Sequence, residues 1–139
     1  MLPEDANPWG NVHGGSIMKL VDSAAGVVAT RHCRTRVVTA RIDEMSFLRP
    51  VFIGNVVTLK ASVNDTGHTS LEVGVRVEAE NLTSGETWHV GSAYLIYVSL
   101  DERGNPATVP PITPKSADER RRQREARERR ARRQRRPER

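Results

Sequence analysis

The sequence lacks the features by which secreted and membrane proteins are recognised. Its single cysteine, Cys33, excludes an intrachain disulfide framework and is typical of a reducing compartment. No apolar run approaches the roughly 20 residues of a membrane-spanning helix, and the acidic start, residues 1–5, has no signal-peptide core. We therefore expect a cytoplasmic protein that does not insert into membranes, whose 139 residues fit one domain.

Metal ligands and aromatic residues are also scarce. The four histidines and Cys33 show no ligand spacing, which predicts that neither a metal nor an organic cofactor takes part. Aromatic residues make up only 4% of the chain, and none lies in the basic segment 115–139. Since five acidic residues also interrupt that segment, the sequence argues against specific nucleic-acid recognition.

The net charge of +5 is unevenly distributed along the chain. Residues 115–139 hold 13 of the 22 Lys and Arg residues and 5 of the 17 acidic residues, which gives +8 and leaves −3 for residues 1–114. The first part of the chain is therefore mildly acidic. The Arg/Glu-rich tail, 115–139, has almost nothing apolar to bury, so it is predicted to be a frayed, solvated helix or disordered.

The apolar pattern from Ile17 to about His32 has helical periodicity, with a narrow polar stripe. Ser16 is the expected N-cap or first-turn residue of this helix. Such a wide apolar arc predicts a helix that is buried on most sides, with Asp22 at the edge of the polar stripe.

After this helix, apolar residues recur at every second position, which is the period of β-strands. Strand-like segments cover 37–47, 57–63, 70–79 and 87–100. The last of these is apolar on both faces, as a central or subunit-bridging strand is. Turn-rich segments that predict hairpins lie at 54–55, 64–67 and 81–85. One long helix followed by antiparallel strands predicts an α+β domain over residues 1–114, in which the sheet curls around the helix.

A glycine pair, Gly14 and Gly15, leads directly into the predicted helix. Adjacent glycines allow a ligand to approach the free N–H groups and the positive dipole end of a helix N-terminus. Asn11 and His13 lie just upstream, and Asp22 follows on the helix. Backbone donors, an amide, an imidazole and a carboxylate in one short segment indicate an acyl-transfer site.

Six motifs give the chain a resemblance to a known family. They are Asn7–Gly15, Lys19–Gly26, Thr30–Cys33, Val38–Asp43, Phe47–Val51 and Ser92–Leu100. In their order and spacing, residues 3–114 resemble the hotdog-fold acyl-CoA thioesterases, in particular the branch of brain acyl-CoA hydrolase and its small bacterial relatives. The charged C-terminal extension is similar to those that family members carry.

The resemblance implies a hotdog fold whose subunits pair edge to edge as a homodimer and assemble further as a trimer of dimers. It implies hydrolysis of acyl-CoA to the free acid and CoA at the dimer interface. Asp22 of one subunit would act as base or nucleophile, and Asn11 of the other would orient water or the thioester. Gly15, together with Gly14, would donate a backbone N–H to the thioester oxygen, and His13 would shape the loop or hydrogen-bond the carbonyl.

Three further residues are candidates for binding CoA by resemblance. Arg49 would line the nucleotide channel, and Thr69 and Ser70 would contact pantetheine or phosphate. Each of the three could equally be a solvated side chain. A second basic cluster is interpreted as contributing to solubility alone, and consists of Arg31, Arg34 and Arg36.

Simpler interpretations stay open for the catalytic candidates. Asp22 lies three residues after Lys19, the spacing of a surface ion pair worth at most ~0.5 kcal/mol. Asn11 follows a glycine, which is typical of a turn. Two other functions also stay open: a hotdog hydratase or dehydratase of acyl thioesters, and a non-catalytic protein that binds anionic surfaces through its basic tail.

Overall fold

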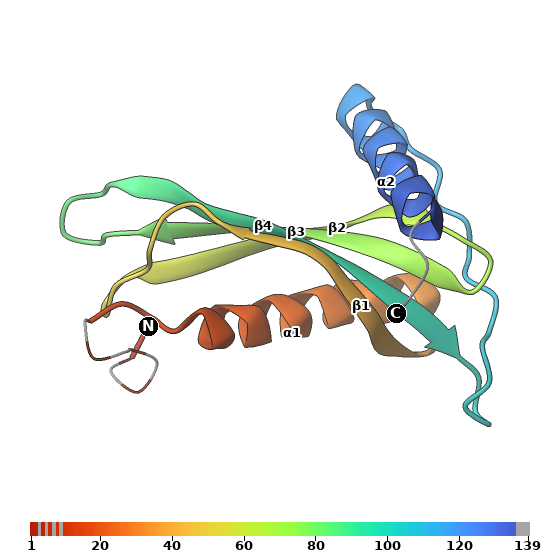
Figure 1. Ribbon diagram of the computed structural model, residues 1–139, viewed down its shortest axis with the longest axis horizontal. Coiled ribbons are helices and arrows are strands. Elements are labelled where there is room, and N and C mark those ends of the chain that lie inside the picture. Colours follow the sequence, from red (N-terminus) through yellow and green to blue (C-terminus); the bar gives the residue numbers. More distant parts are fainter. Residues whose placement is uncertain (3, 5, 7, 9, 136–139) are drawn as a thin grey trace.

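The computed structural model describes residues 1–2, 4, 6, 8 and 10–135, and arranges one sheet between two helices (Figure 1). In chain order the elements are helix α1 (Gly14–Cys33), strands β1 (Arg36–Phe47), β2 (Val56–Thr66), β3 (Ser70–Glu80) and β4 (Thr87–Leu100), and helix α2 (Ala117–Arg135). Helix α1 follows one face of the sheet, and α2 covers part of the opposite face (Figure 1). The expected α+β class, an antiparallel sheet around one long helix, is confirmed, and α2 adds a layer.

Helix α1 begins at Gly14, three residues earlier than the apolar pattern predicted. His13 is its N-cap residue, and the His13 carbonyl accepts the N–H of Ser16 at 3.0 Å. The glycine pair therefore forms the first turn of the helix instead of preceding it. At the other end the chain turns through Arg34, whose left-handed conformation (φ 58°) lets its N–H donate to Thr30 O at 2.7 Å.

The sheet is antiparallel throughout, with the strand order β1-β4-β3-β2. The prediction that the last strand is central is confirmed. Hairpins join β2 to β3 and β3 to β4 as expected, but the hairpin expected at 54–55 is wrong. That connection joins the two edge strands, β1 and β2, which do not pair. A local turn signal cannot distinguish these cases, because the strand that separates β1 from β2 comes later in the chain.

The core lies between α1 and the sheet. Helix α1 contributes residues four positions apart, namely Ile17, Val21, Ala25, Ala29 and Cys33. The sheet contributes alternate residues of the two inner strands, such as Val73 and Leu95. Burial raises the pKa of the Cys33 thiol, although a hydrogen bond with Ser99 opposes the shift. Cys33 is therefore a buried free thiol within the core.

The expectation that the helix is buried on most sides is wrong for the single chain. Met18 and Leu20 are both 38% exposed, and Val27 is 55% exposed. One sheet can cover only one side of a helix, so these side chains have no cover within the described chain. Edge strand β1 is also largely exposed, including Val38 and Ile42. An exposed apolar surface of this kind is typical of an interface and not of a solvated face.

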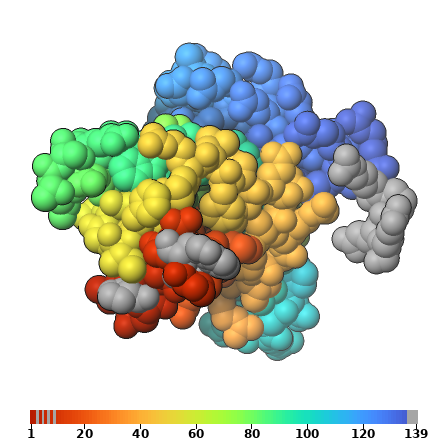
Figure 2. Space-filling view, turned by 60° about the vertical axis from the view of Figure 1, so that its left-hand side comes forward, coloured from red at the N-terminus to blue at the C-terminus, as the bar shows by residue number. Residues whose placement is uncertain are grey.

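Residues 117–135 form helix α2, in agreement with the helical alternative predicted for the tail, but a buried ion pair docks this helix on the sheet, which the prediction of a solvated tail did not include. Arg129 donates two hydrogen bonds of 2.9 Å to the carboxylate of Glu72, and its guanidinium lies 3.7 Å from the ring centre of Tyr94. Burial acts to lower the pKa of Arg129, but the Glu72 carboxylate outweighs this effect and raises it. Further along α2, Arg133 donates to Asp43 at 2.8 Å. In the space-filling view α2 forms a ridge along the top of the molecule (Figure 2).

Gly91 is required by the close approach of β1. A Cβ atom at this position would overlap the carbonyl oxygen of Ser46. We expect Gly91→Ala to lower the free energy of unfolding by about 1–3 kcal/mol or more, as overpacking does. Gly26→Ala is the matched control, because its Cβ would lie 3.9 Å from the Tyr97 hydroxyl in ordinary contact. Because Gly26 lies in the interior of a helix, Gly26→Ala should raise the free energy of unfolding by about 0.5–1 kcal/mol. Urea unfolding of both variants measures the two effects.

The buried ion pair allows a second stability prediction. Arg129→Met removes the bidentate partner of the buried Glu72 carboxylate and leaves it only the Asn64 amide at 3.0 Å and Arg133 at 3.9 Å. Loss of one partner of a buried ion pair costs about 3–5 kcal/mol in comparable cases. The double variant Arg129→Met with Glu72→Leu should recover most of this loss, because it removes the unpaired charge. Arg124→Met, at an exposed position on the same helix, should change stability by no more than about 0.5 kcal/mol. A loss below about 1 kcal/mol for Arg129→Met would show that α2 does not dock in solution.

Candidate active site

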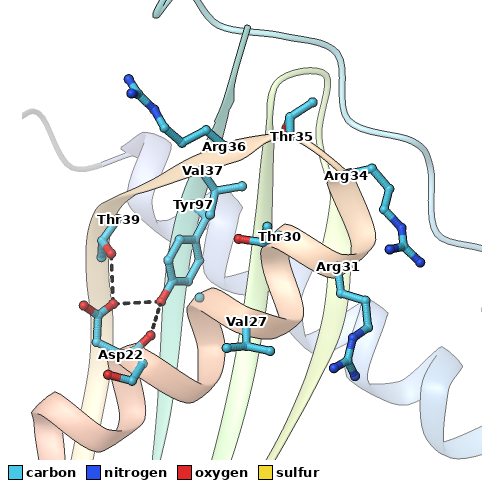
Figure 3. A pocket seen from close by; sticks show the side chains of 12 residues that line it. Asp22, Val27, Thr30, Arg31, Arg34, Thr35, Arg36, Val37, Thr39 and Tyr97 are labelled. Atoms are coloured by element: carbon cyan, nitrogen blue, oxygen red, sulfur yellow. Dashed lines mark hydrogen bonds between the residues drawn. The ribbon is translucent and has the colours of Figure 1, made fainter. Parts of the chain in front are cut away.

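The Asp22 carboxylate is held by two hydroxyl groups from the sheet (Figure 3). Thr39 Oγ1 donates to Asp22 Oδ1 at 2.9 Å, and the Tyr97 hydroxyl donates to the same oxygen at 2.8 Å. The Tyr97 hydroxyl also lies 3.0 Å from the backbone oxygen of Asp22. In the described part of the chain the other carboxylate oxygen, Oδ2, has no partner, and Asp22 forms no ion pair with Lys19. One oxygen is thus fixed while the other is left for water or a ligand.

Thr39 and Tyr97 reach Asp22 together because they are direct partners in the β1–β4 ladder. Directly paired residues of antiparallel strands point to the same face of the sheet, here the face that α1 covers. Burial, and after it the hydrogen bond to Asp22, raises the pKa of Tyr97 well above its ordinary value. Tyr97 is therefore a permanent donor to Asp22 near neutral pH.

Asp22 lies at one end of an open hollow of about 990 Å³, the Asp22 groove. Its walls are Tyr97, the face of α1 from Asp22 to Arg31, the turn at 34–35, and the start of β1 as far as Thr39. Figure 3 shows Arg31 and Arg34 extending from the end of α1, on the side away from Asp22. The groove therefore joins a carboxylate to a basic end.

A second hollow of about 360 Å³ lies at the other end of α1, and we call it the N-terminal hollow. Its lining comprises Asn11, Val12, Gly14, Ile17, Phe47, Leu48, Arg49, Pro50, Val51 and Val90. Most of this lining is apolar. Asn11 forms a bridge with Phe52 across the loop that follows β1. The predicted site residues of one chain are thus divided between two hollows.

The helix N-terminus offers two backbone donors. Within the described chain the N–H groups of Gly14 and Gly15 have no acceptor, because they lie in the first turn of α1, where no helical carbonyl precedes them. A Cβ at Gly15 would meet nothing within 4 Å, so a ligand has room to approach. The side chain of His13 is exposed and makes no capping hydrogen bond.

These donors and the Asp22 carboxylate cannot act on one bond within a single chain. Gly15 and Asp22 are seven residues apart on the same helix, and a rise of 1.5 Å per residue separates them by roughly 10 Å along its axis. The expected site therefore needs one end of α1 from each of two chains, as the sequence interpretation required.

The three residues expected to contact CoA do not come together. Arg49 is exposed, lies 3.4 Å from a carboxylate oxygen of Glu86, and stacks at 5.1 Å over Trp88. Thr69 and Ser70 lie at the β2–β3 turn, at the end of the sheet where α1 terminates, and line neither hollow. Their contacts with CoA stay predictions.

A model of the Thioesterase superfamily matches residues 10–86, more than half of the chain. The chain belongs to the thioesterase superfamily. The rat cytosolic acyl coenzyme A thioester hydrolase is 39% identical over 122 residues, which are 86% of this chain. The chain spans about a third of the length of that relative, 32%.

Solved structures of acyl-CoA thioesterases have the same architecture as this chain. This architecture is the hotdog fold. An apo-hexameric acyl-CoA thioesterase superposes with a TM-score of 0.94 at 36% identity, covering 97% of this chain and 86% of that one. The acyl-CoA hydrolase of Staphylococcus aureus, in complex with butyryl coenzyme A and coenzyme A, gives a TM-score of 0.90 at 30% identity, covering 96% and 82%. Alanine variants of an asparagine, an aspartate and a threonine of that enzyme have also been solved.

The sequence interpretation of this thioesterase-superfamily chain missed Thr39 and Tyr97. Both lie in motifs that carried the resemblance, but their contact with Asp22 depends on the register of β1 and β4. Two irregularities shift that register, one after Thr39 and one after Ile42. The alternating pattern of β1 indicates a strand, but it cannot predict which residue lies opposite Tyr97.

The raised pKa of Tyr97 predicts its titration. An ordinary tyrosine ionises near pH 10, and folding favours the neutral phenol here. The stabilisation that the neutral Tyr97 phenol gives the folded state is therefore present below about pH 10 and lost as the pH rises above it. In a Tyr94→Phe variant Tyr97 is the remaining tyrosine of the two in the chain. Its tyrosinate absorbance should appear only well above pH 10 in the folded protein, and near pH 10 in denaturant. Ionisation near pH 10 in the folded variant would contradict the Tyr97–Asp22 contact.

Proposed function

We propose that this protein hydrolyses acyl-CoA thioesters to the free acid and CoA. The observation that carries the proposal is the Asp22 carboxylate, with one oxygen fixed by Thr39 and Tyr97 and the other open to the groove. The relatives named acyl-CoA thioester hydrolases and the hydrolase solved with coenzyme A support this substrate class.

In the proposed reaction, Asp22 Oδ2 takes a proton from water, and the water oxygen bonds to the thioester carbon. The carbon–sulfur bond then breaks, and the thiolate of CoA takes a proton. In the alternative, Asp22 attacks the carbonyl directly and the carbon–sulfur bond breaks to release the CoA thiolate, after which water cleaves the resulting anhydride to the free acid and the Asp22 carboxylate. Both routes place negative charge on the carbonyl oxygen, where the N–H groups of Gly15 and Gly14 would stabilise it. Neither route needs a metal or an organic cofactor.

The proposed active unit is a homodimer, in which the α1 N-terminus of one subunit faces Asp22 of the other. The separation of Gly15 and Asp22 along α1 supports this arrangement, as do the exposed apolar residues of α1 and β1. Hexameric relatives support further assembly, for which we propose a trimer of dimers. We also propose that the protein acts in the cytosol, because its mammalian relatives are named cytosolic acyl coenzyme A thioester hydrolases. Within the described residues, no helix has the length and apolar character that a membrane crossing needs.

The spacing of three residues suggests which asparagine serves this site. In the Staphylococcus aureus variants the asparagine precedes the aspartate by 15 positions, and the threonine follows it by 17. In this chain Asn7, Asp22 and Thr39 have these two intervals, whereas Asn11 precedes Asp22 by only 11. Asn7 lies outside the described residues. The spacing favours Asn7 over the originally expected Asn11 for orienting water or the thioester.

Asp22→Asn tests the chemical step without disturbing the site, because the amide oxygen can still accept from Thr39 and Tyr97. We expect kcat for thiol release from acyl-CoA to fall by about 100-fold or more, as loss of a general base does. Lys19→Gln is the matched control, since it removes a charge from the same helix one turn away, and should retain activity. Activity of Asp22→Asn near that of the unmodified protein would remove Asp22 from the mechanism.

The two asparagines are compared as single variants in the same thiol-release assay. Asn7→Ala should lower kcat by roughly tenfold or more, the usual effect of losing a positioning hydrogen bond. Asn11→Ala should have the smaller effect on kcat, because its spacing from Asp22 does not match. The reverse order would restore Asn11 as the residue that faces Asp22.

A further inference from the structure

The outward face of helix α2 carries a row of arginines that contributes little to the fold. Arg120, Arg124, Arg127 and Arg135 recur at helical intervals and are all exposed. A rise of 1.5 Å per residue gives this outer row a length of roughly 22 Å. In the part of the chain that the structure describes, only Arg127 of the four lies near an acidic side chain, at 3.6 Å. One acidic residue, Glu128, lies on the same face.

The inward face of the same helix holds the outer row in place. Arg129 and Arg133 bind Glu72 and Asp43 on the outer face of the sheet, and Ala126 is buried. These contacts fix the orientation of α2, so its opposite face points to solvent, and Figure 2 shows the helix as a ridge on the molecule. A partner of the outer row therefore meets an ordered helix and does not have to order it on binding.

The outer row offers charge without apolar or aromatic surface. Among the exposed residues of α2 only Ala117 and Ala131 are apolar. The helix thus has no side chain that could enter the lipid interior and no ring on which a nucleotide base could stack. Guanidinium groups bind phosphate oxygens through two parallel hydrogen bonds. The outer row therefore suits a partner that presents many phosphate groups at its surface.

The charges on the flanks of α2 favour a flat surface over a groove. Asp118 and Glu125 lie along one flank and are 74% and 47% exposed. The exposed carboxylate of Glu44 lies beside the helix, 3.7 Å from Arg132. A helix in a nucleic-acid groove has phosphates on both sides, and these carboxylates would face them. A layer of anionic lipid headgroups contacts only the ridge, where the outer row lies.

We propose that the outer row of α2 binds the protein reversibly to an anionic membrane surface. Because no apolar side chain enters the lipid, the attraction is electrostatic and weakens as salt is added. Such binding does not depend on the proposed function, but it has a consequence for it. An acyl-CoA with a long acyl chain partitions into lipid, and a hydrolase held at the membrane surface would meet its substrate there.

The test measures cosedimentation of the full chain with vesicles of phosphatidylglycerol and phosphatidylcholine in equal parts. The row variant combines Arg120→Gln, Arg124→Gln and Arg135→Gln, because glutamine has nearly the helix propensity of arginine. Arg127 is kept, since it lies beside the buried Asp65. Each basic side chain near an anionic surface contributes about fivefold to binding, so we expect the association constant of the row variant to fall roughly tenfold or more.

The matched control removes the same net charge away from α2, by replacing the exposed residues Lys19, Arg31 and Arg103 with glutamine. Its binding should stay within about twofold of that of the unmodified protein, which separates the outer row from the overall charge of the protein. Unmodified protein should not sediment with vesicles of phosphatidylcholine alone. It should also be released at about 1 M salt, where the Debye length falls to about 3 Å. Urea unfolding checks that the row variant keeps the stability of the unmodified protein.

Several results would overturn the proposal. Absence of binding by the unmodified protein would do so, as would equal binding by the row variant or an equal loss in the control. Binding that survives about 1 M salt would show that the contact is not electrostatic. If duplex DNA binds more tightly than the vesicles at the same salt, and the row variant loses that binding, the outer row is a nucleic-acid surface instead. Thiol release from acyl-CoA is measured separately, so failure of the proposed function leaves these outcomes readable.

Discussion

The contact between Tyr97 and Asp22 couples the central strand to the central helix. The Tyr97 side chain is buried in the core, and its hydroxyl reaches both the carboxylate and the backbone of Asp22. Since Thr39 of the edge strand donates to the same oxygen, three elements converge on one atom. A carboxylate on a helix surface would otherwise sample several rotamers. Here the sheet selects one, and the remaining oxygen faces the groove.

The sequence was most informative where the structure is periodic. The period of two located the four strands of the sheet. What the sequence could not provide were relations between distant segments. The turn signal at 54–55 is local and cannot predict that β4 pairs with β1 in place of β2. The contact of Thr39 with Asp22 depends on the register between β1 and β4. The apolar arc of α1 predicted burial but not what would cover it.

Helix α2 shows the same limit in terms of charge. Counting apolar residues predicted a tail with nothing to bury, yet Arg129 is among the buried residues of the structure. The outer face of the sheet carries Asp43, Asp65 and Glu72, and arginines of α2 lie against all three. The net charge of +8 in the tail and the net charge of −3 in the rest of the chain are therefore partly paired in space. Composition alone could not predict this, because the acidic residues come from three different strands.

Placing a donor pair and a carboxylate on one rigid helix has a consequence for assembly. The helix holds Gly15 and Asp22 at a fixed separation of roughly 10 Å, so no movement within one chain can bring them to the same bond. A two-fold axis across the exposed faces of α1 and β1 would pair each donor end with the carboxylate of the other subunit, and would produce two equivalent sites at once. This geometry predicts how a dimer of one unmodified and one variant subunit behaves. A subunit that lacks the Asp22 carboxylate still contributes its Gly15 donors, so one of the two sites in a mixed dimer should remain complete.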